Sequence, residues 1–155
     1  MKIGTIMTAE VESCGLTAPL TQVAKQMWEA ACGAIPIVDA KGRVEGIVTD
    51  RDISMALVNS GRRPQSILAR EVMTSTVQTC RADEDVMAAL VKMQTHRVRR
   101  LPVVLQDGRL LGMLSIDDIV TRALVPDAPS STAIVTTLRK IFDYKSRTPQ
   151  VEPVM

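Results

Sequence analysis

The feature that most constrains this chain is an internal repeat with an offset of 66 residues. Residues 6–53 align with residues 72–119 without a gap, and 12 of the 48 aligned pairs are identical. Unrelated segments of ordinary composition would share about three. One unit of about 50 residues buries too little surface to be stable alone. The repeat therefore predicts one unit built twice, with the two copies packed on each other.

Each copy contains an amphipathic helix followed by two short strands. The helix is predicted from apolar residues at spacing i, i+3, i+4, i+7, which form one face. Residues 34–38 and 44–48 are strand-like in the first copy, and residues 101–105 and 110–114 correspond to them in the second. The residues of the two helical faces are Leu20, Val23, Ala24 and Met27, and Val86, Ala89, Leu90 and Met93.

A second helix is expected to open at Thr49 in the first copy and at Ser115 in the second. The unit is then β-α-β-β-α. The fold class predicted is α+β, a tandem pair of βαββα units packed sheet to sheet with pseudo-twofold symmetry. The side chains expected to face inward from this second helix are Ile53, Ala56 and Leu57, and Ile119, Ala123 and Leu124.

The predicted boundaries follow from the repeat and from turn-forming residues. The copies span residues 6–59 and 72–125, with a linker at 60–71 that contains glycine, proline and arginine. Residues 126–155 form a C-terminal extension with a short helix. Ser131 or Thr132 is expected to cap this helix, with Ile134, Leu138 and Ile141 on one side.

Composition argues against several functions. The net charge is only +2, and Trp28, Phe142 and Tyr144 are the only aromatic residues, so a stacking surface for single-stranded nucleic acid is not expected. Cys14, Cys32 and Cys80 lack CxxC spacing and the chain has one histidine, so no metal site is predicted. We expect reduced thiols, no secretory signal, no membrane span and a cytoplasmic location.

A hydroxyl residue followed three positions later by an acid opens the second helix of both copies. The pairs are Thr49 with Asp52 and Ser115 with Asp118. One interpretation is a capping box, in which the two side chains satisfy free backbone N–H groups. The other is a ligand site, because a helix N-terminus attracts anions and a carboxylate can accept hydrogen bonds from ribose hydroxyls.

Together these motifs resemble the CBS (cystathionine β-synthase) domain. The resemblance rests on Ile6-Met7-Thr8, the Leu/Ile-Pro-Val/Ile-Val run, the glycine turn, and Gly-x-x-Thr/Ser-x-x-Asp, in order and in both copies. It implies a two-copy Bateman module with two clefts between the copies. Family clefts commonly bind AMP, ADP, ATP or S-adenosylmethionine, so the expected ligand is an adenine nucleotide and no catalytic cofactor is expected.

The resemblance also implies which residues hold the ligand. Asp52 and Asp118 would bind the ribose, and Thr49 and Ser115 would reach a phosphate. The opposite copy would hold the adenine. The site of Asp118 would include Met7, Glu12, Cys32 and Gly33, and that of Asp52 would include Met73, Gln78, Val98 and Arg99.

The copies differ where the first helix ends, because Ala30-Ala31-Cys32-Gly33-Ala34 corresponds to His96-Arg97-Val98-Arg99-Arg100. One interpretation is a solvated basic helix end. The other, similar to phosphate contacts in the kinase γ subunit of the family, places His96 and Arg97 at the ligand's phosphates. Arg51 and Asp117, at the helix starts, are further candidate site residues. Because arginine pairs well with phosphate, we expect a phosphorylated ligand.

Three other functions compete with ligand sensing. An enzyme is not expected, because the chain has no Walker loop, GxSxG, HExxH or GxGxxG motif. A weak nucleic-acid binder would use the run at 96–100 with Arg62 and Arg63. A dimerisation or interaction scaffold would leave its clefts empty. Sensing implies a homodimer or a regulated protein partner that reads the orientation of the two copies.

Overall fold

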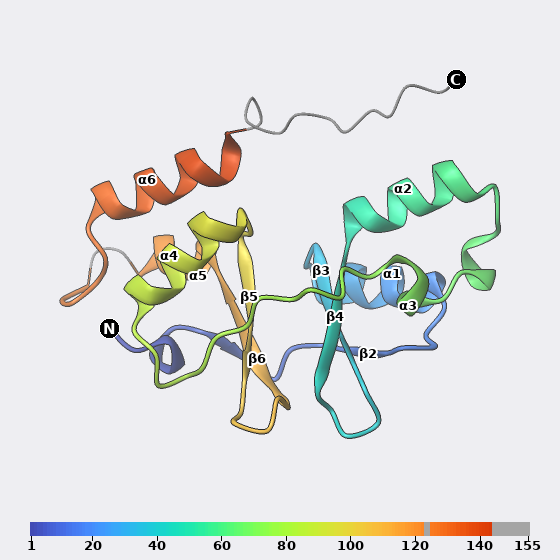
Figure 1. Cartoon of the computed structure of the whole chain (residues 1–155), viewed down its shortest axis with the longest axis horizontal. Coiled ribbons are helices and arrows are strands. Elements are labelled where there is room, and N and C mark those ends of the chain that lie inside the picture. The colour runs from blue at the N-terminus through green and yellow to red at the C-terminus, as the bar shows by residue number, and fades with distance from the viewer. Residues whose placement is uncertain (123–124, 144–155) are drawn as a thin grey trace.

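The computed structural model describes residues 1–122 and 125–143. It forms two halves, each with a three-stranded sheet near the centre and helices outside it (Figure 1). The first half contains β2 (Cys14–Gly15), α1 (Leu20–Glu29), β3 (Ala34–Val38), β4 (Val44–Thr49) and α2 (Asp50–Ser60). The second contains α4 (Val86–His96), β5 (Arg100–Val104), β6 (Leu110–Ser115) and α5 (Ile116–Thr121). The predicted repeat of one mixed unit is confirmed.

Each half is completed by a segment from the other copy. The segment that precedes the helix and strands of one copy pairs with a strand of the other copy. β1 (Thr8–Ala9) pairs antiparallel with β6 of the second half, and the 3₁₀ turn η1 (Ile3–Thr5) precedes it. In the same way Thr74 bridges to Ile47 of β4 in the first half. The two sheets therefore have the orders β1-β6-β5 and β2-β3-β4. This exchange ties the two copies into one structure.

The segment between the copies belongs structurally to the first half. It contains η2 (Pro64–Ser66) and α3 (Ala69–Val72). The amide of Leu20 donates to the carbonyl of Ile67 at 2.9 Å, and the amide of Ala69 donates to the carbonyl of Ala18 at 2.8 Å. Ala69 is fully buried in the first core. The expected linker therefore packs as part of a folded half.

The two halves are related by pseudo-twofold symmetry, which is plain at the strand turns. The amide of Val44 donates to the carbonyl of Gly108 at 3.1 Å. The symmetric bond joins the amide of Leu110 to the carbonyl of Gly42 at 2.9 Å. Because both bonds cross between the halves, the β3–β4 and β5–β6 hairpins are held together at their tips.

The C-terminal extension forms α6 (Ser131–Phe142), which packs on α4 (Figure 1). The predicted helix is confirmed, but its cap is Ser130 and not Ser131 or Thr132. Ser130 is extended and its Oγ accepts from the amide of Ala133, whereas Ser131 is already helical. Ile134 and Ile141 of α6 are buried in the second core.

The prediction for the first half holds only in part. Ile53 packs against the first core and Ala56 is half-buried, but Leu57 is exposed, as is Ala24 of α1. In the second half Leu90 of α4, the repeat counterpart of Ala24, is fully buried. The reason is that α6 covers the second half, and no described element covers α1 and α2 in this way. The inward-facing residues expected at Ala123 and Leu124 lie outside the described residues.

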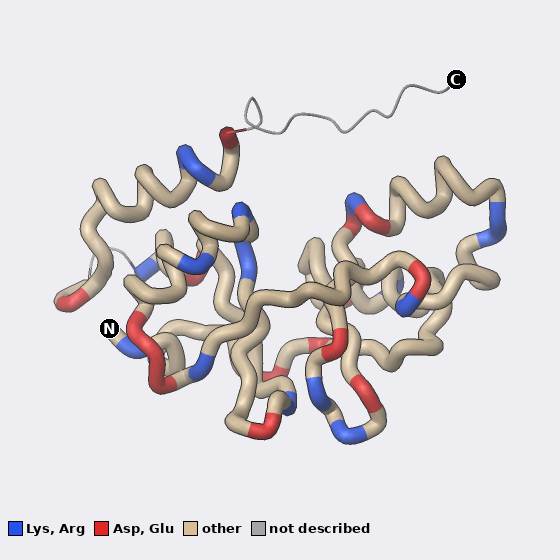
Figure 2. Tube along the Cα trace, in the orientation of Figure 1, with Lys and Arg blue, Asp and Glu red and all other residues tan. Residues whose placement is uncertain are grey.

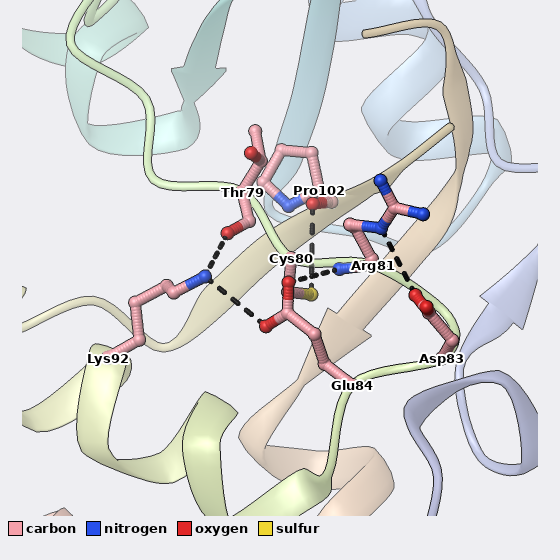
Figure 3. Close-up of polar contacts among 7 residues, drawn as sticks. All are labelled: Thr79, Cys80, Arg81, Asp83, Glu84, Lys92 and Pro102. Atoms are coloured by element: carbon pink, nitrogen blue, oxygen red, sulfur yellow. Dashed lines mark hydrogen bonds and ion pairs between the residues drawn. The ribbon is translucent and has the colours of Figure 1, made fainter. Parts of the chain in front are cut away.

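The loop before α4 is fixed by polar contacts around a buried thiol (Figure 3). Lys92 Nζ donates to the carbonyl of Thr79 at 2.6 Å and approaches Glu84 at 3.5 Å. Burial raises the pKa of Cys80 to about 12, and burial with the nearby Glu12 charge raises the pKa of Cys14 to about 11. Both thiols are therefore protonated at neutral pH, and all three cysteines are free.

Among the described residues, no helix is both long and apolar enough to span a bilayer.

Candidate functional site

The helix starts predicted as capping boxes form them in both halves. Asp52 Oδ2 accepts from the Thr49 amide at 2.8 Å, and Thr49 Oγ1 accepts from the Asp52 amide at 3.3 Å. The corresponding distances at Ser115 and Asp118 are 2.7 and 3.1 Å. One carboxylate oxygen of each aspartate is thus used by the cap. The other oxygen of Asp118 accepts from Thr8 Oγ1 at 3.4 Å.

A first cleft, here cleft 1, lies between the start of α2 and the segment where α4 leads into β5. Its volume is about 290 Å³. Both halves and the end of α6 contribute to its walls. The residues that line cleft 1 are Ala34, Ile47, Thr49, Arg51, Thr74, Thr76, Val77, Gln78, Arg97, Val98, Arg99, Arg100, Pro102, Ile141 and Phe142.

A second cleft, cleft 2, is the pseudo-symmetric counterpart between the start of α5 and the segment where α1 leads into β3. Its volume is about 440 Å³, so both clefts are near the size range of small-molecule pockets. The residues that line cleft 2 are Thr8, Glu10, Val11, Glu12, Ala30, Ala31, Cys32, Ala34, Pro36, Arg100, Met113, Ser115, Asp117 and Asp118.

The repeat offset pairs the two walls position by position, and the pairs differ in charge. Arg51, Arg97, Gln78 and Thr76 in cleft 1 correspond to Asp117, Ala31, Glu12 and Glu10 in cleft 2. Every one of these differences makes cleft 1 more positive. The two clefts are formed by equivalent segments of the repeat and differ in the charge of the side chains that line them.

Cleft 1 is a cationic site. Arg51, Arg97, Arg99 and Arg100 line it, no carboxylate does, and none of the ion pairs among the described residues involves these arginines. Figure 2 shows basic residues at the start of β5, and a basic residue beside acidic ones at the start of α2. Their guanidinium groups are available for an anion, and arginine pairs with phosphate through two parallel hydrogen bonds.

Cleft 2 is acidic. Glu10, Glu12, Asp117 and Asp118 line it together with one cation, Arg100, which lines both clefts. Glu12 accepts a hydrogen bond from Gln26 Nε2 at 3.2 Å. A carboxylate-rich wall repels phosphate, because like charges raise the energy of a bound anion. The two clefts therefore differ in the charge of the residues that line them.

The structure brings most of the residues expected around Asp52 into cleft 1, but not the aspartate itself. Asp52 lines a separate surface groove with Arg62, although its carboxylate makes the same cap as that of Asp118. Met73 packs into the first core, and His96 is the exposed last residue of α4, so neither lines the cleft. The expected residues that do line cleft 1 are Thr49, Arg51, Gln78, Arg97, Val98 and Arg99.

In cleft 2 the ribose aspartate expected from the resemblance is present. Met7 is not, because it packs against the second core, and the neighbouring Thr8 lines the cleft in its place. Gly33 lines a groove between α1 and α2 with Trp28. The expected residues that line cleft 2 are Glu12, Cys32, Ser115, Asp117 and Asp118.

Several lining residues were not named from the sequence. Arg100 belongs to the basic run that was noticed, and its position at the start of β5 places it in both clefts. Thr8 and Thr74 are an identical pair of the repeat, and that identity was a signal for them. Phe142 lies on α6, which follows the second copy, so the repeat gave no signal for it.

The walls of the two clefts offer different hydrogen-bonding groups. Cleft 1 has guanidinium groups, hydroxyls and an amide, and cleft 2 has carboxylates, hydroxyls and the guanidinium of Arg100. Within residues 1–122 and 125–143, no three His, Cys, Asp or Glu side chains gather closely enough to hold a metal ion.

Comparison with known sequences identifies the repeated unit. The family model of the CBS domain matches residues 3–59 and 69–124. Hypoxic response protein 1 of Mycobacterium tuberculosis is 34% identical over 114 residues, covering 74% of this chain and 79% of that protein. Protein MK0525 of Methanopyrus kandleri is 31% identical over 120 residues, and the chain spans 61% of its length. The chain spans only 23% of a homoserine O-acetyltransferase of Methanococcoides burtonii to which it is 33% identical.

Solved structures share the fold. Hypoxic Response Protein I, solved with two coordinated zinc ions, superposes with a TM-score of 0.73 at 32% identity, covering 81% of this chain and all of that one. The CBS domain pair of MJ0100, in complex with 5′-methylthioadenosine and S-adenosylmethionine, superposes with a TM-score of 0.69 at 26% identity. The match covers 78% of this chain and 94% of that one. The chain therefore belongs to the CBS domain family and carries the domain as a tandem pair.

Proposed function

We propose that this protein is a regulatory module that binds adenosine nucleotides in the clefts between its two CBS repeats. The observation that carries the proposal is the set of four arginines that line cleft 1, Arg51, Arg97, Arg99 and Arg100, with no carboxylate among the lining residues. Such a set favours a phosphorylated ligand. The adenosine ligands of MJ0100 support the nucleoside part, because that CBS pair has the same fold.

In cleft 1 we assign AMP, ADP or ATP. Thr49 at the cap of α2 and the arginines of the α4–β5 segment would hold the phosphates. Gln78 and the apolar residues Val98 and Ile47 would surround the nucleoside. Asp52 has no role in this assignment, because it lines a different groove.

In cleft 2 we assign an adenosine compound without phosphate, such as S-adenosylmethionine. Asp118 would accept from the ribose hydroxyls through the carboxylate oxygen that the cap leaves available, while Ser115 completes that cap. Glu10, Glu12 and Asp117 disfavour a phosphate and favour a cationic group. The sulfonium of S-adenosylmethionine carries such a charge.

The module has no catalytic step in this proposal. Ligand binding would favour one orientation of the two repeats, and a homodimer partner or a regulated protein would read that orientation. We also place the protein in a reducing compartment such as the cytoplasm, because Cys14, Cys32 and Cys80 are free thiols.

Isothermal titration calorimetry of the purified protein tests the proposal. The ligands are AMP, ADP, ATP, adenosine, GMP and S-adenosylmethionine. Arg99→Ala should weaken AMP about tenfold or more, because it removes charged hydrogen bonds to phosphate. Asp118→Ala should weaken S-adenosylmethionine and leave AMP unchanged. Arg63→Ala, which removes an exposed arginine outside both clefts, is the matched control and should change neither.

Two results would contradict the proposal. If no adenine compound binds the wild-type protein, the clefts are not nucleotide sites and the interaction-scaffold function is favoured. If Arg63→Ala weakens AMP as much as Arg99→Ala does, the attraction comes from overall charge and the arginines of cleft 1 have no specific role.

A further inference from the structure

The 66-residue repeat explains nearly all of the residues that line cleft 1. The lining residues that lie outside the repeat are informative. Most lining positions of cleft 1 have a lining counterpart in cleft 2 at the 66-residue offset. Ile141 and Phe142 have none, because they come from α6, which follows the second copy. Cleft 1 is thus a family cleft to which the C-terminal helix adds a third wall.

The helix that supplies this wall is firmly seated. Ile134 and Ile141 are buried in the second core, and Thr137 is fully buried. Gln94 Nε2 of α4 donates to Thr137 Oγ1 at 2.6 Å. Because these contacts are spread over two turns of α6, the position of its last residues relative to α4 and cleft 1 is determined by the core.

The two residues of the third wall are placed differently. Ile141 is buried and is needed for packing. The side chain of Phe142 is not part of the core, since the residue is 44% exposed. Phe142 is the only phenylalanine of the chain and one of three aromatic residues. A large aromatic ring at the wall of a cleft lined by arginines is a surface on which a flat ring can stack.

We propose that Phe142 is a ligand contact that stacks on the base of the nucleotide in cleft 1. This inference rests on the proposed function and deepens it, since it assigns base recognition to a residue outside both CBS repeats. It makes cleft 1 selective for a phosphate that carries an aromatic base over a sugar phosphate alone. It also places the ligand in direct contact with α6, so ligand binding in cleft 1 changes the contacts of this helix.

The test compares two ligands that differ only in the base, AMP and ribose 5-phosphate. Calorimetry is run on wild type, Phe142→Leu and Phe142→Ala. Val135→Ala is the matched control, because Val135 is on the same helix, is 55% exposed and does not line the cleft. Arg99→Ala assigns the signal to cleft 1, since it should weaken both ligands there.

The expected result is that Phe142→Ala weakens AMP about tenfold, within the range found when a stacked aromatic is truncated. Phe142→Leu keeps apolar contact area and should still weaken AMP, because it loses the ring. Neither variant should change the affinity for ribose 5-phosphate. In proton NMR of wild type, the adenine H2 and H8 resonances should shift upfield on binding, and this shift should be lost in Phe142→Leu.

Three outcomes would overturn the inference. Equal weakening of AMP and ribose 5-phosphate would mean that Phe142 supports the cleft structurally and does not contact the base. Unchanged AMP affinity in both variants, with wild type binding normally, would remove Phe142 from the site while leaving the proposed function intact. Absence of binding by both ligands to wild type would instead refute the proposed function, and the role of Phe142 with it.

Discussion

At the scale of single residues, the identical glycines of the repeat mark where one half's segment crosses the other. A Cβ on Gly112 would collide with the backbone carbonyl oxygen of Thr8, which pairs with β6. A Cβ on Gly46 would instead meet the side chain of Met73. The same sequence position is therefore constrained by backbone in one half and by a flexible side chain in the other.

Gly112→Ala should destabilise the protein more than Gly46→Ala. The first substitution forces β1 away from β6, at about 2–3 kcal/mol, whereas Met73 can change rotamer and reduce the cost to about 1 kcal/mol. Urea denaturation followed by circular dichroism measures both. Equal losses of stability would contradict this account of the glycine pair.

Arg97 shows a conflict between backbone preference and function. It ends α4 with φ 53° and ψ 42°, a left-handed conformation in which glycine is favoured, and Ala31 has φ 49° at the equivalent position. Glycine would relieve strain at either position. An arginine at such a position, in the wall of cleft 1, is consistent with a side chain retained for binding.

Arg97→Gly should therefore raise stability while weakening AMP. We expect a gain of about 0.5–1 kcal/mol in the free energy of unfolding and a loss of about tenfold in affinity. Ala31→Gly is the matched control, since it should give a similar gain in stability with no change in AMP affinity. An Arg97→Gly variant that binds AMP as wild type does would exclude Arg97 from the phosphate site.

At the scale of elements, the turn between β3 and β4 is stabilised by one carboxylate. Asp39 accepts from the amides of Lys41 and Arg43, each at 2.8 Å, and from Arg43 Nε at 2.7 Å. The hydrogen bond from the Arg43 amide is the main cause that lowers the pKa of Asp39 below 3.8, and the Arg43 side chain adds to it. The ionised form is therefore the one that stabilises the folded turn.

Asp39→Asn should make the protein less sensitive to acid. Because the folded pKa lies below the unfolded value, the stabilisation is present above that value and is lost as pH falls through the folded pKa. Wild type should lose more stability than the variant as the pH falls from about 5 to about 2. Urea unfolding at a series of pH values measures this. Parallel profiles for the two proteins would show that Asp39 is not involved.

At the scale of the whole molecule, the two halves differ in what covers their helices. Gln94 of α4 is bonded to α6, but its repeat counterpart on α1, Trp28, is 87% exposed. Val58 of α2 is 79% exposed and Met55 lies on the same helix. Trp28 lines a groove between α1 and α2, and its exposed ring is the contact that we assign to the homodimer of the proposed function.

We expect Trp28→Glu to weaken self-association at least tenfold, because tryptophan is enriched among residues that dominate interface energies. Sedimentation equilibrium over a range of concentrations measures the dimer constant. Val135→Glu, which places the same charge on the exposed side of α6, is the control and should leave the constant unchanged. A wild-type protein that stays monomeric at all concentrations would refute the homodimer.

Local patterns in the sequence were sufficient for the repeat and for the elements of each unit. The offset of 66 residues is read directly from the sequence. The apolar spacing in α1 and α4 and the Thr49 and Ser115 caps depend on interactions within a few residues of chain. For that reason periodicity and capping chemistry predicted them, and the family resemblance followed from their order. The charge difference between the copies was also visible at His96 to Arg100.

Only the tertiary structure decided which of these residues meet. The exchange of β1 onto β6 brings Thr8 to Asp118, and the seating of α6 on α4 brings Phe142 to cleft 1. The same packing leaves Trp28 uncovered and places Asp52 at a surface groove outside cleft 1. These are contacts between residues far apart in the chain, and neither periodicity nor motif spacing carries information about which distant surfaces pack together.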